Sequence, residues 1–138
     1  MRRLLLCCLP FVLGGCALLG PRHDPSQAWI DLYSDRGETV EAVRVDERSL
    51  DDDDYFQVSP GAHALQMRVR FEVAPGNVGT GDEPMPRTCL MTLDYADFAA
   101  GERYRVRTGS RGFRPWAQLY GADGERLARA REGRCGDV

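Results

Sequence analysis

Cys16 carries the most specific chemistry in this sequence, because it follows two glycines at the end of an apolar N-terminal run. Arg2 and Arg3 give the chain a positively charged start, and residues 4–13 are apolar with a single break at Pro10. A basic start, a short apolar core and a small-residue cleavage site are the three parts of a secretory signal peptide. The apolar run falls well short of the roughly 20 residues that a membrane-spanning helix needs. The sequence therefore predicts an exported protein with a cleaved signal.

The segment Leu13-Gly14-Gly15-Cys16 resembles the lipobox of bacterial lipoproteins. The resemblance implies that residues 1–15 are removed and that Cys16 begins the mature chain and carries the lipid. In Gram-negative lipoproteins an Asp after the cysteine commonly retains the protein in the inner membrane. Ala17 stands there instead, which implies an outer-membrane anchor facing the periplasm. Two alternatives are an ordinary secreted protein with Cys16 as an incidental thiol, and a cleaved peptide in which Cys7 or Cys8 matters.

Two further cysteines, Cys89 and Cys135, remain after the export segment is set aside. Cysteines of exported chains meet an oxidising compartment, where two that are left over usually pair. In the chain-entropy model, closing the loop between them stabilises the fold by about 4 kcal/mol. A redox or metal role is the alternative, but the sequence has no C-x-x-C spacing and no histidine near either cysteine. We expect a structural disulfide and no metal site.

His63 and the run Asp51-Asp52-Asp53-Asp54 are the other candidates for chemistry. A catalytic histidine needs an orienting partner within hydrogen-bond reach, and none stands near His63 in sequence. We expect its ring to pack at the edge of the fold and to hydrogen-bond the preceding turn. The aspartate run lacks the alternating spacing that wraps ligands around Ca²⁺, so we expect a solvated loop. Weak Ca²⁺ binding is the alternative.

Arg103, Arg105 and Arg107 alternate with apolar residues and so form a basic row on one face of a predicted strand. Arg111 and Arg114 follow, and Arg68 and Arg70 are expected on the same solvated surface. One interpretation is contact with anionic lipid, peptidoglycan carboxylates or an acidic partner. The other is cross-strand pairing with Glu72 and Glu102. The large aromatic residues are expected in the core and at the edges, and they are Trp29, Tyr33, Phe113, Trp116 and Tyr120.

Size and charge limit the class of protein. The chain has 138 residues, and removal of the signal leaves 16 basic against 21 acidic residues, a net charge of −5. That length suits one domain, and the acidic balance gives no support for nucleic-acid binding. Residues 16–27 combine Gly20, Pro21 and Pro25 with polar residues, so they are expected to form a flexible tether in which His23 is solvated.

The rest of the chain alternates apolar and polar residues with Gly/Pro punctuation, which predicts strands. The clearest strand runs over 63–73, where six alternate side chains from His63 to Val73 share one face. Residues 74–87 are expected to be a long exposed loop, and residues 94–100 a single helical turn. Asp123-Gly124 marks a hairpin. The remaining strands are expected at 29–33, 40–45, 55–58, 88–95, 102–108, 116–120 and 125–130.

The turn and strand Val58-Ser59-Pro60-Gly61-Ala62-His63-Ala64-Leu65 resembles small bacterial β-sandwich domains of the PEGA type, and so does the segment 98–104. These patterns predict an all-β protein, a single antiparallel β-sandwich of seven or eight short strands over residues 28–138. The whole chain resembles small Gram-negative outer-membrane lipoproteins.

We expect a non-enzymatic binding or structural module of the cell envelope, held by a lipid on Cys16, with no catalytic residue and no cofactor. Its expected partners are the membrane and an envelope protein, with no nucleic acid. One alternative is an accessory lipoprotein of a secretion or envelope complex. Another is an enzyme with a polar site around His63 and the acidic loop.

Overall fold

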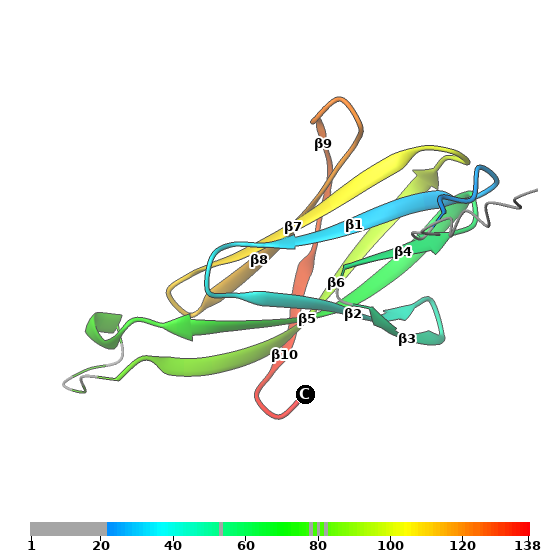
Figure 1. Ribbon diagram of the computed structural model, residues 1–138. Coiled ribbons are helices and arrows are strands. Elements are labelled where there is room, and N and C mark those ends of the chain that lie inside the picture. Colours follow the sequence, from blue (N-terminus) through cyan, green and yellow to red (C-terminus); the bar gives the residue numbers. More distant parts are fainter. Residues whose placement is uncertain (1–21, 53, 78, 80, 82) are drawn as a thin grey trace, which may run out of the picture.

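The computed structural model describes residues 22–52, 54–77, 79, 81 and 83–138, and it is built almost entirely from strands (Figure 1). Ten strands form two sheets of five strands each. The predicted all-β sandwich is confirmed, but the number of strands is larger than the seven or eight expected. The extra strands lie mainly at sheet edges, where one or two apolar residues give no clear alternation.

Sheet A has the strand order β4-β1-β7-β8-β9. Its members are β1 (Ala28–Ser34), β4 (Tyr55–Val58), β7 (Arg103–Arg111), β8 (Arg114–Tyr120) and β9 (Arg126–Arg129). β7 and β8 form a hairpin, and β8 and β9 pair around the predicted Asp123-Gly124 turn. The strand pairs are antiparallel, as predicted, with the exception of β1 and β7, which run parallel. The chain passes through the other sheet between these two strands, and such a crossover allows parallel pairing.

Sheet B has the strand order β10-β6-β5-β2-β3. Its members are β2 (Thr39–Val45), β3 (Arg48–Asp52), β5 (Gly61–Val73), β6 (Met85–Phe98) and β10 (Arg131–Cys135). β5 and β6 form one long hairpin, whose loop end extends beyond the body of the molecule (Figure 1). The predicted alternation of β5 is confirmed, since Leu65, Met67, Val69, Phe71 and Val73 are all buried.

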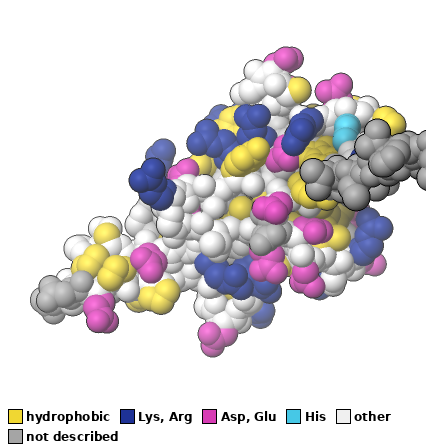
Figure 2. Space-filling model, viewed as in Figure 1, with side chains coloured by type: hydrophobic (Ala, Val, Ile, Leu, Met, Phe, Trp, Pro, Cys, Tyr) yellow, Lys and Arg dark blue, Asp and Glu magenta, His cyan; other side chains and the backbone are white. Residues whose placement is uncertain are grey.

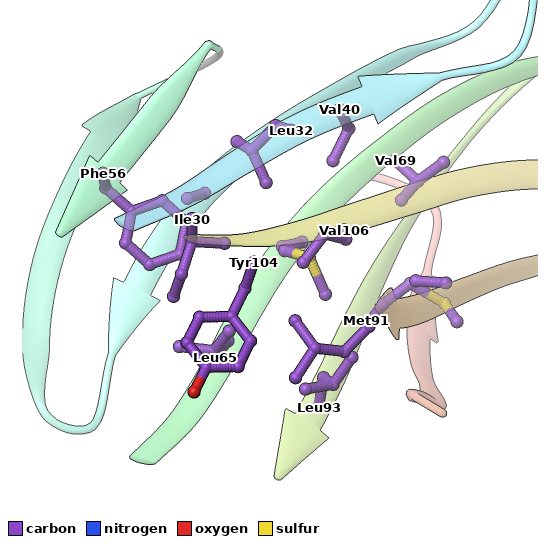
Figure 3. Close-up of a cluster of buried hydrophobic side chains, with 14 of the residues drawn as sticks. Ile30, Leu32, Val40, Phe56, Leu65, Val69, Met91, Leu93, Tyr104 and Val106 are labelled. Atoms are coloured by element: carbon purple, nitrogen blue, oxygen red, sulfur yellow. The ribbon is translucent and has the colours of Figure 1, made fainter. Parts of the chain in front are cut away.

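The hydrophobic core fills the space between the two sheets (Figure 3). Ile30, Tyr104 and Val106 enter it from sheet A, and Leu65 and Met91 enter it from sheet B. Each of these positions is the inward member of an alternating strand, so burying one face leaves every second side chain on the outside. That outer set on sheet A carries the candidate site.

Three local predictions are corrected. Residues 94–100 form no helical turn, because β6 stays extended to Phe98, whose ring is buried and which pairs with Gly61. The loop predicted over 74–87 is shorter, since β6 begins at Met85 and a 3-10 turn covers Pro75–Asn77. The acidic run is not all loop, because Asp51 and Asp52 belong to edge strand β3.

The C-terminal chain moves from one sheet to the other. β9 pairs with β8 in sheet A, and β10, which begins two residues later, pairs with β6 in sheet B. Cys89 on β6 and Cys135 on β10 lie directly opposite each other, with Cα atoms 4.0 Å apart, and are joined in the predicted disulfide. This bond ties the last strand to the core of sheet B.

Candidate functional site: the outer face of sheet A

The outer surface of sheet A combines arginines with aromatic side chains. We call it the arginine–aromatic face. Its members are Trp29, Tyr33, Tyr55, Arg103, Arg105, Arg107, Trp116, Gln118 and Tyr120. They alternate with inward residues of the same strands, as β geometry requires. Figure 2 shows dark-blue basic side chains beside yellow hydrophobic ones over the part of the molecule where β1 and β7 run in Figure 1.

Aromatic and cationic groups touch one another across the strands. The Trp29 ring stacks on Tyr55 with centroids 4.1 Å apart and an interplanar angle of 5°. The Arg103 guanidinium lies 5.3 Å from the Trp29 ring centroid, and that of Arg105 lies 5.6 Å from the Tyr33 centroid. Both contacts have cation–π geometry, in which the ring face attracts the cation. The parallel register of β1 and β7 makes these contacts, since it places Trp29 beside Arg103.

Asp31 holds the most ordered part of this face. Its Oδ1 accepts hydrogen bonds from Trp29 Nε1 at 2.6 Å and from Arg103 Nη2 at 3.0 Å, and its Oδ2 accepts one from Arg103 Nε at 2.6 Å. Burial alone would raise the pKa of Asp31, but the bonds from Arg103 and Trp29 outweigh it and keep the pKa below its ordinary value. Arg103 is therefore neutralised by a fixed, ionised partner.

Arg105 and Arg107 differ from Arg103 in having no such partner. Among the residues that the structure describes, no carboxylate lies within 4.0 Å of either guanidinium. Beside them Tyr33 is 48 % exposed, unusually high for a large hydrophobic side chain of this protein. The Asp31 charge acts on Arg105 at longer range, and Asp35 lines the same pocket as the two arginines, but neither carboxylate makes a direct ion pair with them. Two cations without a direct ion pair, next to an exposed ring, are suited to an anionic ligand that also has an apolar surface.

The predicted basic row is confirmed on one face of β7, but its predicted surroundings are partly wrong. Arg68 and Arg70 lie on β5 in sheet B, not on the same surface, and they contact Glu41 at 2.9 and 3.8 Å. Arg103 pairs with Asp31 and not with the expected Glu72 or Glu102. Sequence reasoning missed Asp31, since only the parallel pairing of β1 with β7 brings it there.

The aromatic residues are less buried in the core than predicted. Trp29 is buried, but under Arg103 on the outer face and not between the sheets. Tyr33 and Phe113 are exposed, and Phe113 lies in the β7–β8 turn with the Arg87 guanidinium 5.3 Å from its ring centroid. Trp116 and Tyr120 point outward from β8 and are half-buried. The alternation of β8 was visible in the sequence, but it did not reveal which set faces the core.

His63 lies in a hydrogen-bonded cluster that joins two turns. Its Nδ1 is 2.8 Å from Asp46 Oδ2, and its Nε2 is 2.7 Å from the Ser59 carbonyl oxygen and 3.2 Å from Ser59 Oγ. The expected bond to the preceding turn is confirmed, and Asp46 is the orienting partner that the sequence did not reveal. Because Nε2–H donates to a carbonyl at the shorter distance, this nitrogen is not free to take a proton from Ser59.

Asp46 closes the tight β2–β3 turn with a left-handed backbone, φ 53°. Its Oδ1 accepts a hydrogen bond from the Ala64 N–H at 2.9 Å. That bond, followed by the one from His63, lowers the pKa of Asp46 below its ordinary value. The cluster therefore fastens the β2–β3 turn to the start of β5, which is a structural role.

The acidic run does not gather into a cation site in the described part of the chain. Asp51 and Asp52 lie on β3, and the Asp54 carbonyl accepts a backbone bond from Leu32 N, while Asp53 lies outside the described residues. Within those residues, the one group with metal-ligand proximity is Cys89, Glu132 and Cys135, and both of its sulfurs are in the disulfide.

The N-terminal chain reaches the domain beside the arginine–aromatic face. Cys16 and the predicted signal peptide lie outside the described residues. The end of the predicted tether is docked rather than free: Asp24 N donates to Gln57 Oε1 at 2.8 Å, and the Gly101 N–H donates to the Gln27 carbonyl at 2.9 Å. His23 is exposed, with its ring edge-on to Trp29 at 5.5 Å.

Comparison with known proteins identifies no relative. No family model, no curated protein and no solved structure matches this chain. Among the described residues there is no helix with the length and hydropathy to span a membrane.

Proposed function

We propose that this protein is a lipid-anchored envelope lipoprotein whose domain binds an anionic component of the envelope on the arginine–aromatic face, without catalysing a reaction. The observation that carries the binding role is the pair Arg105 and Arg107, two cations without a direct ion pair beside the exposed ring of Tyr33. Burying an anion against a preformed row of guanidiniums gives short, charge-assisted hydrogen bonds.

The fixed part of the face supports this role. Asp31 and Trp29 hold Arg103 in one orientation, so the row on β7 begins from a rigid end. A surface that is ordered before the ligand arrives loses less conformational entropy on binding. The two cations that remain are therefore presented by a strand that does not need to rearrange.

The position of the chain entry supports a membrane-proximal role. Residues 16–21 separate the expected lipid from the described chain, and six extended residues span at most about 20 Å. The chain then docks at His23 and Asp24, next to Trp29. A lipid on Cys16 would keep the arginine–aromatic face within reach of the bilayer surface, where two or more acyl chains give stable anchoring.

The anchor is tested by Cys16→Ser. We expect the variant to keep the size of the uncleaved precursor and to be absent from the outer-membrane fraction. The parent chain should be processed to the mature size and labelled by a radioactive fatty acid. A labelled, membrane-bound Cys16→Ser product of mature size contradicts the lipoprotein proposal.

The binding face is tested by Arg105→Glu with Arg107→Glu in the mature chain, using co-sedimentation with purified peptidoglycan and with anionic vesicles. We expect the double variant to lose co-sedimentation and the parent to lose it with rising salt. Arg44→Glu with Arg48→Glu is the matched control, because it makes the same charge change on sheet B, at exposed positions. Equal loss in both double variants contradicts a specific face.

A second candidate function, an accessory lipoprotein of an envelope complex, is favoured by the β5–β6 hairpin. Its loop end extends beyond the sandwich, as a protein-contacting arm would (Figure 1). Shortening the segment between Pro75 and Pro84 while keeping the fold should then abolish cross-linking to an envelope protein in cells. Unchanged cross-linking contradicts this candidate.

A further inference from the structure

A cavity of about 530 Å³ opens beside β8, where the chain crosses from sheet A to sheet B. The crossing is made at Ala130, whose N–H donates to the Ala117 carbonyl at 2.9 Å. The polar and aromatic side chains that line it include Arg111, Arg114, Trp116, Gln118, Tyr120 and Arg129. The volume lies in the range of small-molecule sites, about 300–1,000 Å³.

The cavity is positively charged. Three of its lining residues are arginines, and Glu132 is the single carboxylate among the described residues that line it. In the described part of the chain, no carboxylate lies within 4.0 Å of Arg111, Arg114 or Arg129. These guanidiniums present planar donor forks that match carboxylate and phosphate oxygens. An anionic group on the ligand satisfies them.

Trp116 is the largest apolar side chain that lines the cavity. It lies opposite Gly109 on β7, and a Cβ at Gly109 would overlap the Trp116 ring, so the indole rests directly on the backbone. The absence of a side chain at Gly109 therefore fixes the ring against the sheet. An indole held in this way can pack against the C–H face of a sugar ring through dispersion contacts.

Two polar groups that line the cavity can bond to parts of a ligand other than its anion. Tyr120 donates its hydroxyl hydrogen to Gln118 Oε1 at 2.6 Å, which leaves the Gln118 amide N–H groups to donate to a ligand. The Glu132 carboxylate is exposed and can accept hydrogen bonds from a ligand. A ligand with hydroxyl groups satisfies both, since a hydroxyl donates and accepts.

We propose that this cavity binds a pyranose sugar that carries a carboxylate or a phosphate. The anion lies on the arginines, the C–H face lies on Trp116, and the hydroxyls bond to Gln118 and Glu132. The inference rests on the proposed function, because it names the class of anionic envelope component that the protein would bind. Sugars with a carboxylate and sugars with a phosphate share this chemistry, and the experiment below separates them.

The test titrates the mature chain, labelled with ¹⁵N, with glucuronate, glucose 6-phosphate and glucose, and follows the Trp116 indole resonance. We expect at least one anionic sugar to bind about 10-fold or more tightly than glucose, and the tighter of the two identifies the anion. The proposal is overturned if glucose binds with the same affinity as the two anionic sugars. It is also overturned if acetate or inorganic phosphate, without a sugar ring, binds with the same affinity as the anionic sugars.

The arginine dependence is tested with Arg129→Gln, which should weaken anionic-sugar binding about 10-fold or more. Arg126→Gln is the matched control, an exposed arginine on the same strand that does not line the cavity. Equal affinity of these two variants overturns the cavity assignment.

The two proposals fail separately. If no sugar binds but the protein still co-sediments with peptidoglycan or vesicles through Arg105 and Arg107, only the cavity proposal is overturned. If sugars bind but the Arg105→Glu, Arg107→Glu variant still co-sediments, the proposed binding face is overturned and the cavity proposal is not.

Discussion

At the scale of single residues, Asp31 decides how the arginine–aromatic face is ordered. The alternation of β1 places Asp31 on the outer face, where a side chain is usually exposed. Its carboxylate is nonetheless nearly buried and accepts three hydrogen bonds from Trp29 and Arg103. A buried carboxylate is stable only with such partners. Removing its charge leaves these three N–H donors with a weaker acceptor.

We expect Asp31→Asn to lower the free energy of unfolding by about 1–3 kcal/mol at neutral pH, because it removes charge-assisted hydrogen bonds. The pKa of Asp31 is lower in the folded state, so its stabilising contribution is complete above the ordinary value of 3.8 and is lost as pH falls through the folded pKa. Denaturant titrations from pH 7 to pH 2 should therefore show a shallower acid loss in the variant. A parallel pH profile contradicts the role of Asp31.

Gly109 is the second residue whose identity follows from one contact. A methyl group there would overlap Trp116 and the Asp35 carboxylate. We expect Gly109→Ala to destabilise the fold by about 1–3 kcal/mol, as overpacking does, and to shift tryptophan fluorescence to longer wavelength. Gly76→Ala, where the added methyl group meets nothing within 4 Å, is the control and should behave like the parent. Similar melting of both variants contradicts the packing argument.

At the scale of elements, the last strand is the one most dependent on a covalent bond. β10 has four exposed residues and one half-buried one, so it gains little from burial. Its attachment to β6 depends on the Cys89–Cys135 disulfide and on a ladder interrupted between Glu132 and Cys135. We therefore expect this element to open first.

Reduction, or replacement of both Cys89 and Cys135 by Ser, should lower the free energy of unfolding by about 2–4 kcal/mol. Hydrogen exchange should become faster in β10 before it does in β5. A reductant should have no effect on the double variant, which serves as its control. If reduction leaves the melting temperature of the parent unchanged, the disulfide is not a main support of this element.

At the scale of the whole molecule, the domain begins earlier than Ala28. The docked residues before β1 bond to Gln57 on β4 and to Gly101 in the turn before β7, and so link three parts of sheet A. The tether predicted over residues 16–27 therefore does not extend to Gln27, because the chain is docked on the domain from Asp24 onward.

A chain starting at Arg22 should melt like the mature chain, whereas one starting at Ala28 should lose about 1–2 kcal/mol, because it removes two cross-domain hydrogen bonds. Calorimetry of the two truncations measures the difference. Identical melting contradicts the inclusion of residues 22–27 in the domain.

Local sequence patterns were enough to predict the fold class and much of the core. Alternation from His63 to Val73 identified the buried face of β5, and the two cysteines that follow the predicted export segment predicted their own pairing. The same alternation identified Arg103, Arg105 and Arg107 as one exposed row. These inferences depend on residues close together in sequence or on a single pair. The lipid on Cys16 also comes from the sequence and stays a prediction.

Which residues meet across neighbouring strands followed from the way the chain is folded and not from any local pattern. Asp31 and Arg103 are 72 positions apart, and they pair because the chain crosses through sheet B and returns parallel to β1. Asp46 reaches His63 through another long-range pairing, the antiparallel one between β2 and β5. A period-two pattern fixes the face on which a side chain lies, but not the strand beside it. The site depends on that second choice, which is made when the two sheets close on a common core.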